Sequence, residues 1–355
     1  MTNLTHKKLL LIDKDHKQAA KAASLHYVTD KESGITRIQK GKKFYYLYQD
    51  KRITDKDQLA RIKKLAIPPS WENVWICYRP DGHIQATGID LNKRKQYRYH
   101  SDWNQLRTQT KFHRLYEFGK TLPCIRKKIQ KDLSQPGLNE NKVLATVINL
   151  MELTYIRVGN NGYEKLYGSY GLTTLKDKHV KVNNEKILFS FTGKKGVEHA
   201  ITLKNKKLAR IVKQCRDIPG RELFQFYQSD GSKRKIDSGM VNSYIKEAAG
   251  GDFSAKDFRT WAGSLQALQS FCSLQDALNE KDIKKNVVTV LDEVSKKLGN
   301  TRTICRKYYV HPGLIELYEQ NKLIACMDKN GKTSITGKGL TAEENNLMQI
   351  LKKNL

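Results

Sequence analysis

The chain has 355 residues, more than one hydrophobic core usually spans, so its length predicts two domains. It carries 65 Lys and Arg against 36 Asp and Glu, and the net charge of +29 favours a polyanionic partner such as nucleic acid. A basic surface tuned only for solubility is the alternative interpretation. No apolar run approaches the roughly 20 residues that span a bilayer, which argues against a membrane protein.

The start of the chain and its cysteines indicate a cytoplasmic protein. Residues 9–12 form an apolar run that is too short for a secretory signal and lacks a small-residue cleavage site. The cysteines show no CxxC pair and no histidines at zinc spacing, so we expect reduced, mostly buried thiols and no metal site. They are Cys77, Cys124, Cys215, Cys272, Cys305 and Cys326.

The first third of the chain predicts a small β-rich domain. Residues 1–32 are polar and Lys-rich with little periodicity, and we interpret them as a loosely ordered basic arm. From residue 33 to residue 105, short alternating runs are separated by turn signals such as Pro80-Asp81-Gly82. The predicted elements are strands at 35–38, 44–48, 71–77 and 83–88, and a helix at 55–65.

A run that ends this domain interleaves cations with aromatic residues. Residues 92–100 read Asn-Lys-Arg-Lys-Gln-Tyr-Arg-Tyr-His, so a strand would show Gln96 on one face and Tyr97 and Tyr99 on the other. Such a strand can neutralise phosphates and pack on sugars of DNA. A surface strand whose tyrosines pack inward is an equally good interpretation.

The rest of the chain predicts a larger, mainly α-helical domain over residues 106–326, followed by a linker and a C-terminal helix over 327–355. A meander at 179–203 adds a three-stranded sheet, so the fold class is α+β. Leu122-Pro123 and Gly159 are expected to end the first two helices. The predicted helices are 101–122, 142–158, 205–217, 241–249, 254–271, 282–298 and 341–351.

Four residues of this domain are informative because of the order in which they occur along the chain. Arg157 follows a helix, Lys194 occupies a hairpin tip, Arg259 lies early in a helix, and Tyr309 lies in a basic run. Each alone is more simply a surface or packing residue. A phenol is a weak nucleophile at neutral pH unless cations stabilise the developing charge, and this set supplies both a phenol and cations.

In this order the residues resemble the catalytic domain of type IB DNA topoisomerases, specifically the poxvirus-like and bacterial branch. The first domain is similar to that branch's N-terminal domain in Ile67-Pro68-Pro69-Ser70-Trp71 and in residues 82–88 and 94–97, so the resemblance covers residues 33–326. The catalytic motifs that match are Tyr155-Ile156-Arg157-Val158-Gly159-Asn160, Phe191-Thr192-Gly193-Lys194, Lys256-Asp257-Phe258-Arg259-Thr260-Trp261-Ala262-Gly263, Leu298-Gly299-Asn300-Thr301 and Tyr309-Val310-His311-Pro312.

The resemblance implies a role for each residue. Tyr309 would attack a DNA phosphorus to give a 3′-phosphotyrosine, and Arg157 and Arg259 would clamp the phosphate oxygens. Lys194 would be the general acid, assisted by Lys256. The contacts implied with DNA are Gln96, Tyr97, Tyr99 and Tyr163.

Asn300 marks the branch of the family. Poxvirus and nuclear type IB enzymes have histidine there, whereas bacterial members have asparagine, which can donate a hydrogen bond but cannot act as an acid or base. The resemblance further implies a monomer that closes on duplex DNA as a C-shaped clamp, works without metal, cofactor or ATP, and relaxes supercoils. We expect it in the cytoplasm with DNA, or in the nucleoid if the host is bacterial.

Two other functions are compatible with parts of this pattern. A tyrosine recombinase shares the fold and much of the residue set, although the N-terminal β-rich domain favours a topoisomerase. A non-enzymatic architectural DNA-binding protein would explain the charge but would leave the ordered set of catalytic-type residues unexplained.

Overall fold

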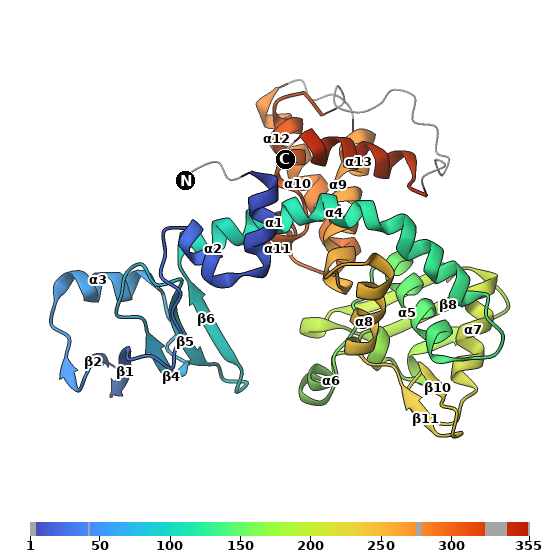
Figure 1. The fold of residues 1–355 in the computed structure, drawn as a ribbon, viewed down its shortest axis with the longest axis horizontal. Helices are drawn as coiled ribbons and strands as arrows, with labels where there is room; N and C mark the ends of the chain where they lie inside the picture. Colours follow the sequence, from blue (N-terminus) through green and yellow to red (C-terminus); the bar gives the residue numbers. More distant parts are fainter. Residues whose placement is uncertain (1–4, 42, 275–278, 324–338, 354–355) are drawn as a thin grey trace. The chain divides into compact units, whose positions relative to one another are not determined.

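The computed structural model describes residues 5–41, 43–274, 279–323 and 339–353. The chain divides into two compact units, residues 1–114 and 115–354, and the division falls inside helix α4, Ser101–Leu133 (Figure 1). The first unit contains a small sheet and the second is mainly helical, so the mixed composition predicted from the sequence is confirmed. No helix among the described residues combines the length and apolar composition that a membrane span needs.

The first unit is built on a six-stranded antiparallel sheet with strand order β3-β2-β1-β4-β5-β6. Helix α3, Lys56–Lys64, begins after Asp55, whose side chain accepts a hydrogen bond from the backbone of Gln58, and it buries Ile62 in the sheet's core. The predicted strands and helix are therefore present. The strands are β1 Ile35–Lys40, β2 Lys43–Tyr48, β3 Lys51–Arg52, β4 Glu72–Ile76, β5 Ile84–Ile89 and β6 Lys95–Tyr99.

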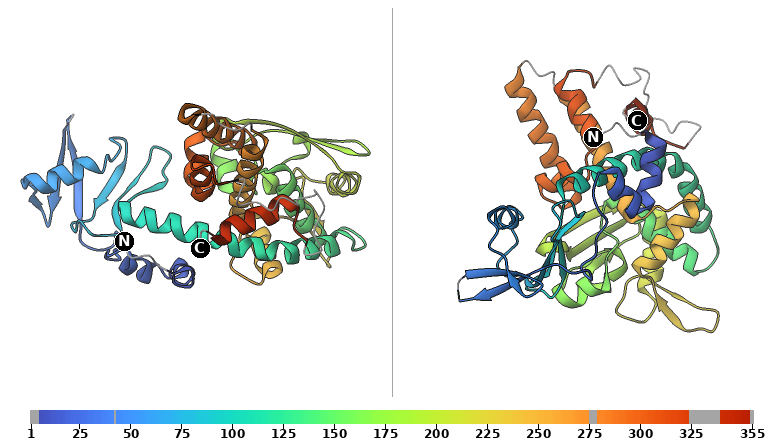
Figure 2. Two further views of the ribbon diagram at one scale, coloured as in Figure 1. Left: turned by 90° about the horizontal axis from the view of Figure 1, so that it is seen from above. Right: turned by 60° about the vertical axis from the view of Figure 1, so that its left-hand side comes forward.

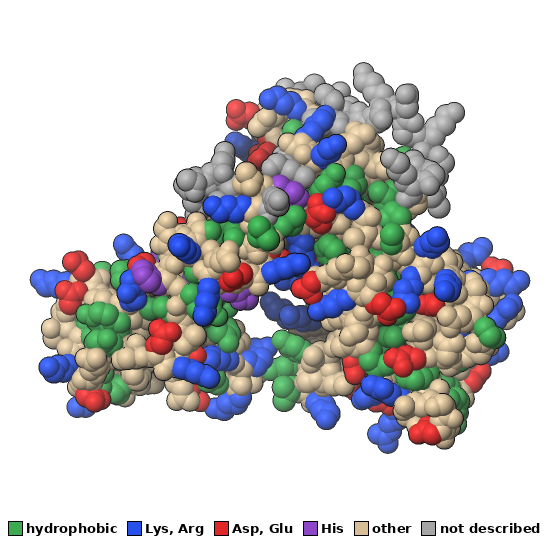
Figure 3. All heavy atoms as spheres, in the orientation of Figure 1, with side chains coloured by type: hydrophobic (Ala, Val, Ile, Leu, Met, Phe, Trp, Pro, Cys, Tyr) green, Lys and Arg blue, Asp and Glu red, His purple; other side chains and the backbone are tan. Residues whose placement is uncertain are grey.

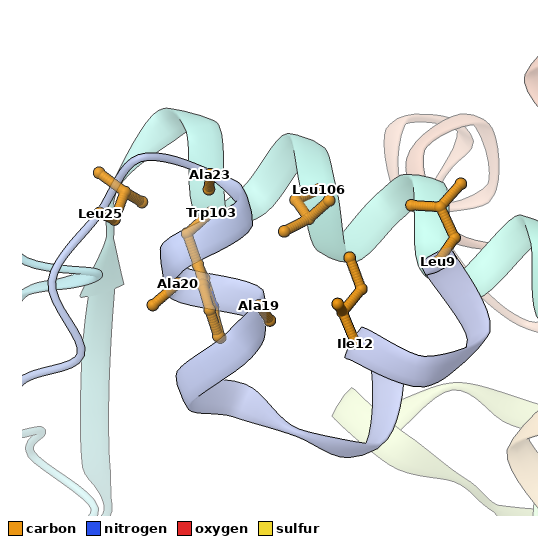
Figure 4. Close-up of a cluster of buried hydrophobic side chains, with 8 residues drawn as sticks. All are labelled: Leu9, Ile12, Ala19, Ala20, Ala23, Leu25, Trp103 and Leu106. Atoms are coloured by element: carbon orange, nitrogen blue, oxygen red, sulfur yellow. The ribbon is translucent and has the colours of Figure 1, made fainter. Parts of the chain in front are cut away.

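The loosely ordered N-terminal arm is a wrong prediction for the described residues. Helices α1, His6–Lys14, and α2, His16–Ala22, lie beside the first half of α4 (Figures 2 and 4), and Asp13 pairs with Arg107 at 3.0 Å and with Arg114 at 3.2 Å. A few apolar side chains suffice, because they form one cluster with Trp103 and Leu106 of α4, while Lys8, Lys14, Lys17 and Lys21 are exposed. The cluster comprises Leu9, Ile12, Ala19, Ala20, Ala23, Leu25, Trp103 and Leu106.

Helix α4 continues through Pro123 to Leu133, so the predicted end at Leu122-Pro123 is also wrong. Proline inside a helix costs about 3 kcal/mol, because one backbone hydrogen bond is lost and the ring crowds the preceding turn. Leu122, Ile125 and Ile129 are buried around it in the second unit, and each such side chain contributes roughly 1.5–3 kcal/mol. Burial thus outweighs the local preference.

The second unit consists of helices around an antiparallel sheet with strand order β7-β8-β9 and a separate β10-β11 hairpin. The strands are β7 Val180–Val182, β8 Lys186–Thr192, β9 Glu198–Lys204, β10 Gln225–Tyr227 and β11 Lys233–Lys235. The helices that follow α4 are α5 Glu140–Thr154, α6 Asn161–Tyr167, α7 Lys206–Arg216, α8 Ser238–Ala249, α9 Ala255–Ser273, α10 Glu280–Leu298, α11 Arg302–Tyr308, α12 Pro312–Glu319 and α13 Ala342–Lys353. Short 3-10 turns occur at Leu172–Thr174, Asp177–His179 and Lys194–Gly196.

The C-terminal helix α13 belongs to the core of the second unit. Arg126 of α4 forms ion pairs with Glu344 at 2.6 Å and with Glu152 at 2.8 Å, and Trp261 Nε1 donates a hydrogen bond to Glu344 at 3.3 Å. The predicted terminal helix is therefore present and is tied to α4, α5 and α9. The predicted linker at 327–340 lies mostly outside the described residues.

Lys and Arg side chains are spread over the surfaces of both units on the face shown in Figure 3. The positive charge on this face therefore does not by itself locate a site. Of the cysteines in the described residues, Cys77, Cys215 and Cys305 are buried and Cys124 and Cys272 are exposed, and none of these five forms a disulfide. Cys326 lies outside the described residues.

Candidate active site

A pocket of about 280 Å³ in the second unit brings five of the six predicted catalytic residues together, all except Asn300. Its walls come from the segment after α5, from α6, from the β8–β9 connection, from the start of α9 and from the residue that follows α11. These elements are far apart in the sequence, so the fold assembles the site. The lining side chains with polar groups are Arg157, Asn160, Tyr163, Ser169, Tyr170, Lys194, Lys256, Arg259 and Tyr309.

Arg157 follows a helix that ends earlier than predicted. Helix α5 stops at Thr154 and not at Val158, because Tyr155 adopts a left-handed conformation with φ of 58°. Arg157 Nη2 then donates hydrogen bonds to the carbonyl of Gly299 at 2.8 Å and to Asn300 Oδ1 at 2.6 Å. Burial, and secondly the charge of Arg259, lowers the pKa of Arg157 to about 10, so the guanidinium stays charged at neutral pH.

Arg259 is more deeply buried, with 7% of its surface exposed. It lies in the second turn of α9, where Nη1 donates to the carbonyl of Tyr155 at 2.5 Å and Nη2 donates to the carbonyl of Leu298 at 2.7 Å. Its Nε is buried and has no hydrogen-bond partner in the part of the chain that the structure describes.

Backbone carbonyls hold both arginines in place. No carboxylate of the described residues is paired with Arg157 or Arg259. A carbonyl fixes a guanidinium without neutralising it, so both positive charges remain available to an anion in the pocket.

Tyr309 lies against these arginines, with its ring centre 5.3 Å from the Arg259 Cζ. A Cβ at Gly263 would lie 2.6 Å from the Tyr309 carbonyl oxygen, so only glycine lets α9 come so close. Ser264 Oγ donates to the same carbonyl at 3.1 Å. Tyr308 is exposed, with Lys307 Nζ 5.4 Å from its ring centre, and it does not line the pocket.

The two lysines of the pocket are held less tightly than the arginines. Lys194 is exposed in the turn between β8 and β9, and its Nζ lies 5.6 Å from the ring centre of Tyr163. Lys256 is exposed in the first turn of α9. Their side chains can therefore adjust their position to a bound group.

Asn300 reaches the site through Arg157. It lies between α10 and α11, its Oδ1 accepts from Arg157 at 2.6 Å, and its Nδ2 is 3.5 Å from the Leu298 carbonyl. The amide nitrogen is thus held only weakly. His199 of β9, beside Gly299, was not predicted as a site residue, because an isolated histidine in a strand carries no motif.

The predicted DNA contacts of the first unit lie on strand β6. Tyr97 and Tyr99 are 42% and 39% exposed and stack on each other with ring centres 5.7 Å apart, and the Tyr99 ring also stacks on Trp103, so neither side chain is fully packed inward. Gln96 Nε2 donates to Asp90 Oδ2 at 2.8 Å, which occupies part of its amide.

Comparison with known proteins assigns the family. Residues 100–332 match the family model described as the catalytic core of eukaryotic DNA topoisomerase I. Residues 43–90 match the N-terminal domain of bacterial DNA topoisomerase IB. The chain belongs to the type IB DNA topoisomerase family. The resemblance stated from the sequence is thereby confirmed.

Viral members of the type IB topoisomerase family are among the similar proteins. DNA topoisomerase 1B of Acanthamoeba polyphaga mimivirus is 36% identical over 306 residues, which cover 84% of this chain and 91% of that protein. DNA topoisomerase 1B of vaccinia virus is 24% identical over 247 residues, covering 68% and 74%. DNA topoisomerase 1 of rabbit fibroma virus is 27% identical over 293 residues, covering 76% and 86%.

Proposed function

We propose that this chain relaxes supercoiled duplex DNA by cutting one strand transiently, letting the duplex rotate and resealing the strand. One observation carries the proposal. The ring centre of Tyr309 lies 5.3 Å from Cζ of Arg259, whose guanidinium donates to two backbone carbonyls, and Arg157 lines the same pocket. That arrangement offers an anion two unneutralised cations and a nucleophile in one place.

The reaction is a transesterification. Tyr309 releases its phenolic proton to solvent as its oxygen attacks a backbone phosphorus, the bond from phosphorus to the 5′ oxygen breaks, and a 3′-phosphotyrosine and a 5′-hydroxyl form. Arg157 and Arg259 donate hydrogen bonds to the non-bridging oxygens, where negative charge accumulates, and Asn300 Nδ2 adds a neutral donor. Donors of this kind each accelerate a reaction by a factor of about 10² to 10³.

Lys194 is the candidate general acid. The 5′ oxygen leaves as an alkoxide unless a proton reaches it, and the exposed ammonium of Lys194 lines the same pocket as Tyr309. Lys256 lines it too and is placed to assist. Attack by the 5′-hydroxyl on the phosphotyrosine reverses every step, and Lys194 then takes the proton back.

The DNA-binding part of the proposal involves both units. Gln96, Tyr97 and Tyr99 of strand β6 and Tyr163 of α6 are the proposed contacts, and on binding duplex DNA the two units would close as the C-shaped clamp expected from the sequence. In this proposal a DNA-binding domain of residues 33–105 works with a catalytic domain of residues 106–326, as a monomer associated with DNA in the cytoplasm.

Replacing the nucleophile tests the proposal directly. Tyr309→Phe should bind duplex DNA with unchanged affinity, because the phenyl ring keeps its place beside Arg259. It should neither relax a supercoiled plasmid nor form a covalent adduct, which gel electrophoresis after denaturation detects. Tyr308→Phe is the matched control and should relax at the wild-type rate. Robust relaxation by Tyr309→Phe would rule out the assignment.

Energy and metal requirements give a second test. One phosphoester replaces another, so the bond energy is kept, and the charge stabilisation comes from arginines. Relaxation should therefore proceed in EDTA without ATP, as followed by the disappearance of supercoiled plasmid. A strict requirement for ATP would contradict the proposed mechanism.

A further inference from the structure

His199 is anchored at the base of the turn that carries Lys194. It is the second residue of β9 and lies five positions after Lys194. It pairs in register with Phe191 of β8, and the two rings stack with centres 5.0 Å apart and an interplanar angle of 23°. The imidazole is thus held by the sheet and not by the turn itself.

Two glycine backbones lie against this imidazole. A Cβ at Gly193 would lie 2.6 Å from His199 Nε2, and a Cβ at Gly299 would lie 2.8 Å from His199 Cε1. Side-chain carbons essentially never approach other atoms so closely, so the ring occupies the space that larger residues would need. Gly193 directly precedes Lys194 and Gly299 directly precedes Asn300, so one ring touches both segments.

Gly299, which touches His199, also holds Arg157, the arginine proposed to bind the phosphate. The Gly299 carbonyl accepts a hydrogen bond from Arg157 Nη2 at 2.8 Å. Burial, followed by the charges of Arg157 and Arg259, lowers the pKa of His199, and Glu198 opposes this effect. The ring is therefore neutral at neutral pH and can pack beside two arginines without repelling them.

We propose that His199 is a positioning residue that sets the distance between the Lys194 turn and the hydrogen-bonded pair of Arg157 and Asn300. The inference rests on the proposed function. A general acid must come within about 2.6–3.2 Å of the atom that it protonates, and a misplacement of about 1 Å can cost a factor of roughly 10² in rate. Lys194 is exposed and lies on a turn, so its reach depends on how that turn is held.

Changing the leaving group of the DNA tests whether His199 acts by positioning Lys194 or only stabilises the fold. In a duplex whose 5′-bridging oxygen is replaced by sulfur, a thiolate leaves without needing a proton, so the position of Lys194 no longer matters. We would measure single-turnover adduct formation on matched oxygen and sulfur substrates that carry the site mapped for the wild-type protein. His199→Ala should slow cleavage of the oxygen substrate about 10- to 100-fold and of the sulfur substrate less than about threefold.

Combined variants sharpen the test. His199→Ala and Lys194→Ala together should cleave the oxygen substrate no more slowly than Lys194→Ala alone, because His199 acts through Lys194. Gly193→Ala should reproduce the oxygen-specific defect, since its methyl group would displace the imidazole from the side of the turn, while φ at this position is −92° and suits alanine. Val197→Ala, at an exposed neighbouring position, is the control and should be unchanged.

The outcomes separate the two proposals. Any of three results would overturn the positioning role and leave the proposed function intact. They are equal slowing of both substrates by His199→Ala, multiplicative effects in the double variant, and wild-type rates in both His199→Ala and Gly193→Ala. Absence of a Tyr309 adduct with the wild-type protein would overturn both. Thermal unfolding shows whether His199→Ala is folded; if it is not, Gly193→Ala decides.

Discussion

The arginines in the pocket of the second unit and two cations on and beside strand β6 of the first unit are held by different kinds of partner. In the pocket, Arg157 and Arg259 donate to backbone carbonyls and an amide oxygen. On and beside β6, Lys95 pairs with Asp30 at 2.5 Å, and Arg94 pairs with Asp90 at 2.7 Å. The pocket arginines therefore keep their charge for a ligand, whereas Lys95 and Arg94 are already neutralised. Arg98 of β6 is the exception, because it donates to the carbonyl of Ala66 at 2.8 Å.

This difference separates chemistry from general attraction to DNA. A cation fixed by neutral acceptors is ready for the charge that develops on a phosphate, and it needs no reorganisation when the reaction occurs. A cation paired with a carboxylate must give up that partner before it can bind a phosphate, so its net contribution to affinity is small. We therefore expect large effects on rate from the pocket and small effects on affinity from β6.

Among substitutions of the cations in these two regions, the largest expected effect comes from Arg259→Lys. An ammonium group cannot reach the carbonyls of Tyr155 and Leu298 together and still face the phosphate, because it lacks the planar fork of the guanidinium. Single-turnover adduct formation should fall by a factor of about 10² to 10³, while affinity for uncut DNA changes less than about threefold. Arg210→Lys, on the exposed side of α7, is the matched control. A rate within tenfold of wild type would show that charge alone suffices.

The order of residues in the second domain could be predicted, because each belongs to a local motif. Arg259 and Gly263 lie one helical turn apart and so share the face of α9 that meets Tyr309. The spacing of Asn300 and Tyr309 likewise follows from a helix end and the short helix α11. The motifs could not predict the hydrogen-bond acceptors of Arg259, because the backbone carbonyls of Tyr155 and Leu298 do not depend on side-chain identity.

Three parts of the fold could not be predicted from the sequence, because tertiary contacts there override the local preference of the residues. Helix α4 passes Pro123 because the side chains around it are buried, and α1 and α2 form because a few apolar residues meet Trp103 and Leu106. Helix α5 ends at Tyr155 through a left-handed residue that is not glycine. His199 escaped notice because its importance depends on two glycines that lie 6 and 100 positions away in the sequence.

The smallest expected effect, and the one that most sharpens the contrast, concerns Tyr97 and Lys95. Tyr97→Phe removes only the hydroxyl and keeps the stack on Tyr99, so affinity for uncut duplex DNA should fall about two- to tenfold, the value of one hydrogen bond. The rate of adduct formation at saturating DNA should not change, because β6 does not touch the reacting phosphate in this proposal.

Lys95→Gln completes the argument by asking whether a paired cation counts toward DNA binding. Each cation that neutralises a phosphate adds about 0.9 to the slope of log affinity against log salt concentration. Because Lys95 is already paired with Asp30, its replacement should change that slope by clearly less than this amount. Replacing Asp30 with Asn in the same assay should make the slope steeper, since it releases Lys95. A loss of a full unit of slope in Lys95→Gln would mean that DNA displaces Asp30, and the two regions would then differ only in burial and not in how their charge is used.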